Sequence, residues 1–238
     1  MILHCFTNNT HTSIVLSMPT LYIIATPIGN LEDITLRALR VLGEVDLVLC
    51  EDTRVTKKLL DKHEIKVPTM SYHSHSKLSK VEKIFGVFEE GKDIALVSDA
   101  GTPTISDPGV LLIQQIKQKF GLSAQAGDDV KIVPIPGPSA VIAALSASGL
   151  PSSDFLFLGF LPHKKGRETL FKEITESKRT VVFYESPHRI LKTLNSLQEH
   201  LGDERKVVIA RELTKIYEEI ISGKPEEILS YFESNPDK

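Results

Sequence analysis

The sequence predicts an α/β fold with a mostly parallel sheet in its first half and a mixed sheet in its second half. From Leu21 onward, short apolar runs alternate with segments of helical periodicity, which is typical of βα units. The 238 residues are 41% hydrophobic and 25% charged, which is close to the average of globular proteins. This composition disfavours disorder, collagen-like repeats and coiled coil, and the length allows one large core or two modest ones.

Four apolar runs in the first half are predicted strands, and a fifth run is a weaker candidate. The four are residues 21–25, 46–50, 94–97 and 131–134, and the weaker one is 69–72. Each strong run leads into a turn and then an amphipathic stretch. Asp33 is expected to cap a helix whose core face comprises Leu36, Leu39 and Leu42. A second core stripe comprises Leu78, Val81, Ile84, Phe85 and Phe88.

The second half offers strands at residues 155–158, 180–184, 206–210 and 218–222, with helices after Pro187 and Pro225. The last two strands follow each other without a helix, so we expect an antiparallel pair within a mixed sheet. The sequence stops directly after a helix, which leaves open whether this sheet has its closing strand.

The domain organisation follows from the turns between the two halves. Residues 134–138 are dense in proline and glycine, and residues 149–151 punctuate the chain again after one helix. We expect an N-terminal α/β domain of residues 20–135 and a C-terminal α/β domain of residues 136–238. Residues 1–19 precede the first strong strand, and we expect them to be a poorly ordered extension.

Charge and cysteine content limit the partners and the compartment. The net charge is −3, so the sequence lacks the overall positive charge of a general nucleic-acid binder, and any RNA contact must be local. We expect neither DNA nor a membrane as a partner. Cys5 and Cys50 lie far apart, and Cys50 sits in an apolar run that suits an inert buried thiol. The first nineteen residues contain no lysine or arginine, unlike a secretory signal, so we expect a cytoplasmic protein.

Three turns at predicted strand ends combine small or φ-restricted residues with polar side chains. They are Thr26-Pro27-Ile28-Gly29-Asn30, Ser98-Asp99-Ala100-Gly101-Thr102-Pro103 and Pro136-Gly137-Pro138-Ser139-Ala140. Ligands of open α/β sheets bind at this edge, where glycine permits close backbone approach. Each turn alone is also explained as ordinary loop punctuation. Neither G-x-G-x-x-G nor a Walker sequence occurs, so neither a dinucleotide nor a nucleoside triphosphate is indicated.

These turns belong to a longer set of motifs that resembles a known family. The further motifs are Glu51-Asp52-Thr53-Arg54, Ser106-Asp107-Pro108-Gly109, Gly149-Leu150-Pro151, Gly159-Phe160-Leu161-Pro162, Phe183-Tyr184-Glu185-Ser186 with His188-Arg189, and Ala210-Arg211-Glu212-Leu213-Thr214-Lys215. Together they resemble the ribosomal RNA small subunit methyltransferase I family of the tetrapyrrole methylase superfamily, over residues of about 20 to 230.

The resemblance implies a two-domain methyltransferase that binds S-adenosylmethionine in the cleft between its domains, usually as a homodimer. It implies 2'-O-methylation of a cytidine in the decoding region of 16S ribosomal RNA, on the assembled small subunit. The implied donor contacts are Ile28, Gly29, Asp99, Gly101, Thr102, Ile105, Ser106, Ser139, Ala140, Phe183, Tyr184 and Ala210.

Three carboxylates in the matched motifs are candidates for the base or for orienting the substrate: Asp52, Glu185 and Glu212. A structural salt bridge with Arg54, Arg189 or Arg211 is the alternative for each. The candidate substrate contacts are Asn30, Arg54, His73, His75, Lys164, Lys165, Arg167, Arg189 and Arg211. Among them, the basic run His163-Lys164-Lys165-Gly166-Arg167 suits RNA phosphates, with a solvated loop as the alternative.

The chain departs from the family pattern at three places. It has His73-Ser74-His75-Ser76 where the family commonly has His-Glu-His-Asn, it carries extra residues around 123–129, and a further apolar strand normally follows its last residue. His73 and His75 are spaced like weak metal ligands, but no further ligands with zinc-site spacing accompany them, so we expect no metal.

Three other functions remain open at this stage. A methylase acting on a tetrapyrrole, a corrinoid or a modified protein side chain would share the fold, because fold alone does not fix the substrate. A non-catalytic ribosome-binding or assembly factor would show a disrupted donor loop, and none of the three loops looks disrupted. A nicotinamide-dependent oxidoreductase is disfavoured by the missing glycine fingerprint.

Overall fold

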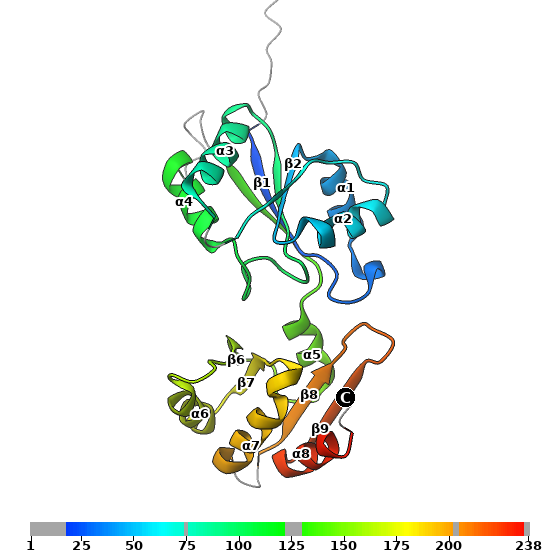
Figure 1. The fold of residues 1–238 in the computed structure, drawn as a ribbon, viewed down its shortest axis with the longest axis vertical. Coiled ribbons are helices and arrows are strands. Elements are labelled where there is room, and N and C mark those ends of the chain that lie inside the picture. Colours follow the sequence, from blue (N-terminus) through cyan, green and yellow to red (C-terminus); the bar gives the residue numbers. More distant parts are fainter. Residues whose placement is uncertain (1–17, 74–75, 122–129, 202–204, 236–238) are drawn as a thin grey trace, which may run out of the picture.

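The structure, a computed structural model, describes residues 18–73, 76–121, 130–201 and 205–235. The described chain forms two α/β lobes that follow each other in sequence (Figure 1). The first lobe holds β1–β5 and α1–α4, and the second holds α5–α8 and β6–β9. The segment that leads from β5 into α5 connects them. The extension predicted for residues 1–19 lies almost wholly outside the described residues.

A five-stranded parallel sheet forms the centre of the first lobe. Its strands are β1 (Thr20–Ile24), β2 (Leu47–Cys50), β3 (Thr69–Ser71), β4 (Ile94–Leu96) and β5 (Lys131–Ile135). The order is β3-β2-β4-β1-β5, and every neighbouring pair is parallel. All five strands fall within the predicted runs to one or two residues, so the predicted parallel sheet is confirmed.

Helices cover both faces of this sheet. They are α1 (Leu36–Glu44), α2 (Thr53–Lys62), α3 (Leu78–Glu89) and α4 (Val110–Phe120). One core packs Ala38, Val41 and Leu42 of α1, together with α2, against the sheet. A second core packs α3 and α4 against the other face, through residues such as Phe88 and Ile116. The first lobe is therefore a three-layer α/β/α arrangement with its polar loops at the strand ends.

Three details of the predicted helices are wrong. Asp33 does not cap α1, because it lies in a short 3-10 helix (Leu31–Asp33). The cap is Thr35, whose hydroxyl accepts a hydrogen bond from the Ala38 N–H at 3.1 Å. Because α1 starts at Leu36, its inward positions are 38, 41 and 42, and Leu36 is 86% exposed. Leu78 likewise occupies the exposed first turn of α3 rather than the core.

The second lobe contains four shorter strands and four helices. The strands are β6 (Phe155–Phe160), β7 (Thr180–Tyr184), β8 (Val207–Arg211) and β9 (Glu219–Gly223). The helices are α5 (Ala140–Ser148), α6 (Arg167–Glu176), α7 (Ile190–Leu201) and α8 (Pro225–Glu233). Phe171 of α6, Leu194 of α7 and Phe232 of α8 belong to one shared core.

The strand pairing in the second lobe differs from a single mixed sheet. β6 and β7 are parallel, and β8 and β9 form the predicted antiparallel pair. In the described part of the chain these pairs are separate two-stranded sheets, because no strand joins β7 to β8. The predicted combination of parallel and antiparallel strand pairs is therefore present, but these strands form two sheets rather than one.

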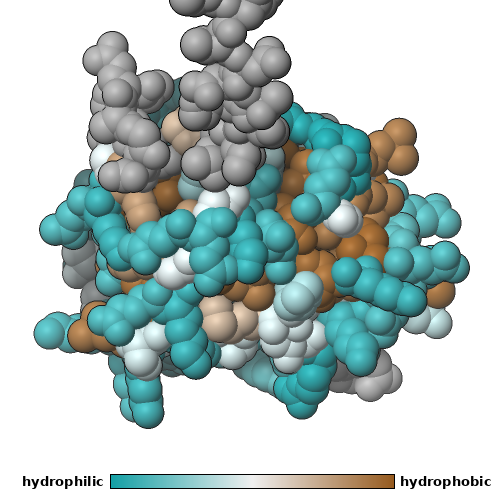
Figure 2. Space-filling model, turned by 90° about the horizontal axis from the view of Figure 1, so that it is seen from above, coloured by the Kyte–Doolittle hydropathy of each residue, from teal (hydrophilic) through white to brown (hydrophobic). Residues whose placement is uncertain are grey.

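The surface of the first lobe and the cysteine Cys50 agree with the expectations from the sequence. Seen from the end of the first lobe, hydrophilic side chains dominate the surface, with apolar atoms visible between them (Figure 2). No helix among the described residues is long and apolar enough to cross a membrane. Cys50 is a free, fully buried cysteine, and burial raises the pKa of its thiol. The predicted inert thiol is therefore confirmed.

Candidate active site between the two lobes

Three polar loops meet at one edge of the first sheet. β4, β1 and β5 are adjacent and parallel, so their carboxyl ends lie side by side. The loops that follow them are named here the β1 loop (residues 26–30), the β4 loop (98–109) and the β5 loop (136–140). The sequence predicted ligand-binding turns in all three, and the sheet order brings them together.

Hydrogen bonds tie the three loops into one unit. The Thr26 N–H donates to the Gly101 carbonyl at 2.9 Å, and the Gly101 N–H donates back to the Thr26 carbonyl at 3.0 Å. The Thr26 hydroxyl also donates to the Ser98 carbonyl at 3.0 Å. The Thr102 hydroxyl donates to the Pro138 carbonyl at 3.1 Å, which links the β4 loop to the β5 loop. The backbone at this edge is therefore held in place by its own contacts.

Glycines allow the loops to approach each other closely. A Cβ at Gly137 would lie 3.0 Å from the Cβ of Ala25, so a side chain there would push the β5 loop away. Gly101 has a φ of +83°, a conformation that favours glycine. A Cβ at Gly101 would project between Ile28 and Pro138, 3.4 Å and 3.8 Å from their nearest atoms. The three loops thus approach to van der Waals distance around Gly101.

The second lobe completes the cleft through two close approaches. A Cβ at Gly29 would lie 2.8 Å from the Leu213 carbonyl oxygen and from the Thr214 hydroxyl. These residues belong to the loop between β8 and β9, residues 212–218, named here the β8 loop. A Cβ at Gly159 of β6 would lie 3.0 Å from the Ser106 hydroxyl of the β4 loop. The cleft therefore has walls from both lobes.

The loops that meet across the cleft carry strained backbone. Thr104 and Ser106 of the β4 loop have φ values of 74° and 66°, and Glu212 and Thr214 of the β8 loop have 49° and 67°. Left-handed conformations cost non-glycine residues of order 1–3 kcal/mol each, and they cluster at functional sites. In the described chain, the only other non-glycine residue with positive φ is Glu64. The residues with strained backbone therefore lie in the same loops as the family motifs.

Tyr184 stands at the carboxyl end of β7 and faces the same cleft. Its ring packs against Phe157 and Phe160, with centroid separations of 5.1 Å and 5.2 Å. Burial raises the pKa of its phenol, and the nearby Asp107 carboxylate adds to the rise. A hydrogen bond from the Val141 backbone N–H, at the start of α5, opposes this shift. β7, α5 and the β4 loop therefore converge on one phenol group.

Carboxylates give the cleft a negative character. Burial raises the pKa of Glu51 and of Asp107, and in both cases the Asp99 carboxylate raises the pKa further. Asp99 itself is exposed and accepts a hydrogen bond from the Asp52 N–H at 3.0 Å. Like charges held together in a partly buried site favour a cation as the ligand, because a cation relieves their repulsion.

Known proteins with this sequence pattern are methyltransferases. A profile of the family described as Tetrapyrrole (Corrin/Porphyrin) Methylases matches residues 20–229. A protein of Thermotoga maritima named ribosomal RNA small subunit methyltransferase I is 48% identical to this chain, over 91% of this chain and 93% of that protein. A protein of Vibrio cholerae with the same name is 53% identical, over 87% of this chain and 69% of that protein. The chain belongs to the ribosomal RNA small subunit methyltransferase I family of tetrapyrrole methylases.

Solved structures agree with this membership at the level of the fold. Uroporphyrin-III-C-methyltransferase from Thermus thermophilus superposes with a TM-score of 0.59 at 19% identity, over 90% of this chain and 89% of that one. A cobalt precorrin-4 methyltransferase superposes with a TM-score of 0.61 at 22% identity, over 91% and 90%. At this identity the likeness shows the predicted two-lobed α/β fold and leaves the substrate undetermined.

The methyl donor of this family, S-adenosylmethionine, fits the residues present. Two buried polar atoms of the second lobe, the Thr214 hydroxyl and Nη1 of Arg211, have no hydrogen-bond partner among the described residues. A polar ligand would supply such partners. The negative character of the cleft also suits a donor that carries a sulfonium and an ammonium group.

The predicted donor residues occupy the walls of this cleft. The first-lobe loops carry Ile28, Gly29, Asp99, Gly101, Thr102, Ile105, Ser106, Ser139 and Ala140, and the strand ends of the second lobe carry Phe183, Tyr184 and Ala210. Asp99, Ile105 and Ser106 are exposed, whereas Ile28 and Ser139 are half-buried. Their geometry is compatible with donor binding, and the individual contacts stay predictions.

Two of the predicted catalytic carboxylates are engaged at the surface of the cleft. Asp52 is the N-cap of α2, and its carboxylate lies 2.6 Å from Nη2 of Arg54. This contact lowers the pKa of Asp52 to about 2, which makes it a weak proton acceptor. Glu212 pairs with Lys215 at 3.0 Å. Glu212 lies in the strained β8 loop, so an orienting role fits it better than proton abstraction.

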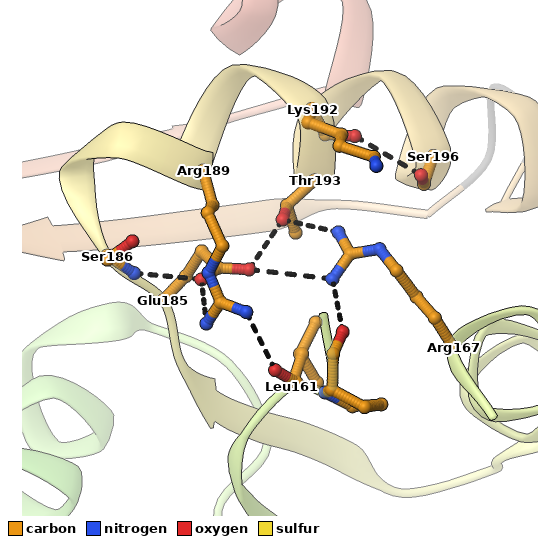
Figure 3. Close-up of polar contacts among 9 residues, drawn as sticks. Leu161, Arg167, Glu185, Ser186, Arg189, Lys192, Thr193 and Ser196 are labelled. Atoms are coloured by element: carbon orange, nitrogen blue, oxygen red, sulfur yellow. Dashed lines mark hydrogen bonds and ion pairs between the residues drawn. The ribbon is translucent and has the colours of Figure 1, made fainter. Parts of the chain in front are cut away.

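The third candidate, Glu185, is the centre of a buried network (Figure 3). Its carboxylate lies 2.5 Å from Nη2 of Arg189 and 3.7 Å from Nη1 of Arg167. It also accepts hydrogen bonds from the Thr193 hydroxyl at 2.6 Å and from the Ser186 N–H at 2.8 Å. Only 4% of its side chain is exposed. The oxygens are occupied by structural partners, which favours the salt-bridge alternative.

The same network changes the interpretation of two predicted RNA contacts. Arg167 is 8% exposed, and its guanidinium donates to the Thr193 hydroxyl at 2.7 Å and to the Pro162 carbonyl at 3.2 Å. The prediction that Arg167 meets RNA phosphates is therefore wrong for this structure. Arg189 similarly donates to the Leu161 carbonyl at 2.9 Å. Both arginines hold the loop after β6 against β7 and α7.

The remaining predicted substrate residues are spread around the cleft. Lys164 and Lys165 are exposed on the loop between β6 and α6. Asn30 is exposed in the β1 loop, and Arg54 is exposed in the first turn of α2. His73 is exposed and its N–H donates to the Ser76 hydroxyl at 2.8 Å. Arg211 is half-buried and lies 3.8 Å from Glu219. His75 lies outside the described residues.

Sequence reasoning missed two acidic residues of the cleft. Glu51 and Asp107 stand inside matched motifs, but they were not among the candidates. Their distinguishing property is a pKa raised by burial, together with the Asp99 carboxylate beside both. This property depends on the packing of the β4 loop, which the sequence does not reveal. The only signal in the sequence was their position. Glu51 directly follows a predicted strand, and Asp107 lies in the same loop as Asp99.

The close approach of Gly29 to the β8 loop generates a test of the cleft. Gly29→Ala places a Cβ 2.8 Å from the Leu213 carbonyl, so the two walls must separate. We expect S-adenosylmethionine to bind at least about tenfold more weakly, or 1.4 kcal/mol, by titration calorimetry. Gly43→Ala is the matched control, because its Cβ would meet nothing within 4 Å. It should leave donor affinity unchanged and stabilise α1 by about 0.5–1 kcal/mol. Equal donor affinity in both variants would contradict this geometry.

The Glu185 network generates a stability prediction. Glu185→Gln leaves Arg167 and Arg189 without a buried counter-charge, so the free energy of unfolding should fall by about 3–5 kcal/mol in urea titrations. Glu168→Gln is the control, because its carboxylate is 71% exposed beside His200. That change should cost less than about 1 kcal/mol. A Glu185→Gln protein as stable as the control would show that the network contributes little.

Proposed function

We propose that this protein transfers a methyl group from S-adenosylmethionine to the ribose 2'-hydroxyl of a cytidine in the decoding region of 16S ribosomal RNA. The observation that carries the proposal is that the family's motif loops, far apart in sequence, converge on one cleft with walls from both lobes. Relatives that are 46–53% identical over 86% or more of the chain, such as that of Escherichia coli O157:H7, bear the matching name.

The reaction is an in-line displacement that needs alignment and the removal of one proton. The donor supplies a methyl group activated by the positive charge on its sulfur. The rigid β1, β4 and β5 loops hold the donor, and the strained β8 loop orients the ribose against it. With the donor bound, the ribose oxygen would bond to the methyl carbon as the carbon–sulfur bond breaks, S-adenosylhomocysteine would leave, and a carboxylate of this chain would accept the proton of the 2'-hydroxyl.

Asp107 is our proposed proton acceptor. Burial raises the pKa of its carboxyl, and a carboxylate with a higher pKa is a stronger base than Asp52. Asp107 lies in the β4 loop, and its charge acts on the Tyr184 phenol of the other lobe. This position is between the two walls that would hold the donor and the ribose.

Contacts to RNA must be local, because the whole chain has a net charge of −3. Lys164 and Lys165, which are exposed beside the cleft-forming β6, are the proposed phosphate contacts. The small ribosomal subunit is the proposed partner, the active form a homodimer, and the compartment the cytoplasm. The proposed domains are residues 20–135 and 136–238, with the cleft at their junction.

The deciding experiment measures methyl transfer from labelled S-adenosylmethionine to small ribosomal subunits that lack the modification. We expect label on the ribose 2'-oxygen of one cytidine, with little transfer to naked RNA or to a tetrapyrrole. Lys164→Ala/Lys165→Ala should keep donor affinity and weaken the salt-dependent binding to subunits. Transfer to a tetrapyrrole or corrinoid would replace the proposed substrate, and donor binding without any transfer would favour a non-catalytic ribosome-binding factor.

The role of Asp107 predicts a change in the pH profile. A carboxylate base works only when it is deprotonated, so the rate should fall on the acid side as pH drops through its raised pKa. Asp107→Asn should lower kcat by about 10²-fold or more and change the donor Kd little. Single-turnover rates on subunits, measured across pH, provide the comparison. A large loss of donor affinity with an unchanged kcat would instead make Asp107 a donor ligand.

A further inference from the structure

Phe160 is an exposed aromatic side chain at the edge of the cleft. It is the last residue of β6 and is 58% exposed, although phenylalanine is usually buried. Its neighbour Gly159 approaches the first lobe, because a Cβ on it would lie 3.0 Å from the Ser106 hydroxyl. The Phe160 ring therefore stands where the second lobe meets the β4 loop.

Part of the Phe160 ring is packed, and the rest is open. The ring lies against that of Tyr184, with a centroid separation of 5.2 Å and an angle of 52° between the ring planes. Tyr184 is itself packed against Phe157, with the centroids 5.1 Å apart. This packing restricts the orientation of Phe160, while more than half of the residue remains exposed. A side chain restricted in this way loses little further freedom when it binds a flat ligand.

The proposed proton acceptor lies close to this ring. Asp107 directly follows Ser106, and its charge acts on the Tyr184 phenol, against whose ring Phe160 packs. In a nucleotide, the base is bonded directly to the ribose that carries the 2'-hydroxyl. A base that lies on Phe160 would therefore hold its own ribose near Asp107, where the methyl transfer requires it.

The loop that follows Phe160 offers contacts for the backbone of the same RNA strand. Lys164 and Lys165 are exposed on this loop. Its first residue is anchored, because Arg189 donates a hydrogen bond to the Leu161 carbonyl at 2.9 Å. Proteins that bind single-stranded nucleic acid combine aromatic rings, on which bases stack, with cations that meet the phosphates. The segment from Phe160 to Lys165 has this combination on a fixed support.

We propose that Phe160 stacks on the base of the target nucleotide and thereby positions its ribose in the cleft. This inference rests on the proposed methyl transfer to RNA and adds a residue that contacts the substrate. Because every base has a face that can stack, Phe160 fixes the position of the nucleotide and does not by itself select cytidine. An unpaired base presents its face most readily, so the target nucleotide is single-stranded when it binds.

The test measures methyl transfer by Phe160 variants to small ribosomal subunits that lack the modification. Phe160→Leu removes the aromatic face and keeps an apolar side chain, so kcat/KM for subunits should fall by about tenfold or more, with the donor Kd unchanged. Phe160→Trp keeps an aromatic face and should retain most of the activity. Leu156→Ala is the matched control, because Leu156 is 41% exposed near the other end of β6. Its kcat/KM should equal that of the wild-type chain.

A tryptophan at position 160 also reports stacking directly, because the chain contains no other tryptophan. Introduced as 5-hydroxytryptophan, it emits separately from the tryptophans of ribosomal proteins. Subunits should quench this emission, and S-adenosylmethionine alone should leave it unchanged. A residue with only a structural role would not respond to the arrival of a base.

The outcomes separate this proposal from the proposed function. If the wild-type chain transfers no methyl group to subunits, the proposed function fails, and the stacking role fails with it. If the wild-type chain is active but Phe160→Leu is equally efficient, or subunits leave the emission unquenched, the stacking role alone is overturned. A weaker donor Kd in Phe160→Leu would make Phe160 a donor contact instead. A changed oligomeric state of this variant in sedimentation would assign the ring to a contact between two copies.

Discussion

The reciprocal hydrogen bonds between Thr26 and Gly101 are the constraint on which the site depends. They join the loops after β1 and β4 across the top of the first sheet, at 2.9 Å and 3.0 Å. Gly101 can take part only because its φ of +83° is accessible to glycine at little cost. With this pair fixed, Ile28 and Pro138 lie beside Gly101, and Gly29 is set against the second lobe. A local backbone contact therefore fixes the first-lobe loops that face the second lobe.

Charge in this protein is used in two opposite ways. The Glu185 network in the second lobe pairs one carboxylate with two arginines and two further donors, so the carboxylate charge is neutralised and the end of β7 is fixed. Glu51 and Asp107 of the cleft, by contrast, form no ion pair among the described residues, and burial together with neighbouring carboxylates raises the pKa of both. The ion-paired Glu185 network stabilises the structure. The carboxylates of the cleft repel one another, and a cationic ligand would reduce that repulsion. In the described chain, the ion-paired carboxylate of Glu185 thus belongs to the scaffold, and the carboxylates of Glu51 and Asp107 belong to the candidate site.

The sequence was sufficient for the strands, for the loops and for the family. Strands were predictable because buried parallel strands are short apolar runs, and their order then placed the loops together. The cap of α1 was mispredicted because Asp33 and Thr35 are both good caps, and the choice depends on the preceding 3-10 helix. Arg167 was mispredicted because a basic run in the sequence does not reveal which side chain turns inward. Burial, and therefore pKa, is a property of packing that a single sequence does not contain.

The divided sheet of the second lobe bears on the cleft itself. β7 carries Phe183 and Tyr184 at its carboxyl end, and β8 carries Ala210, so each of the two small sheets contributes residues to the proposed donor site. Within the described residues β7 and β8 share no backbone hydrogen bonds, but side chains of both strands pack in the core that α6, α7 and α8 share. The packing of this shared core therefore positions the residues that both small sheets present to the cleft.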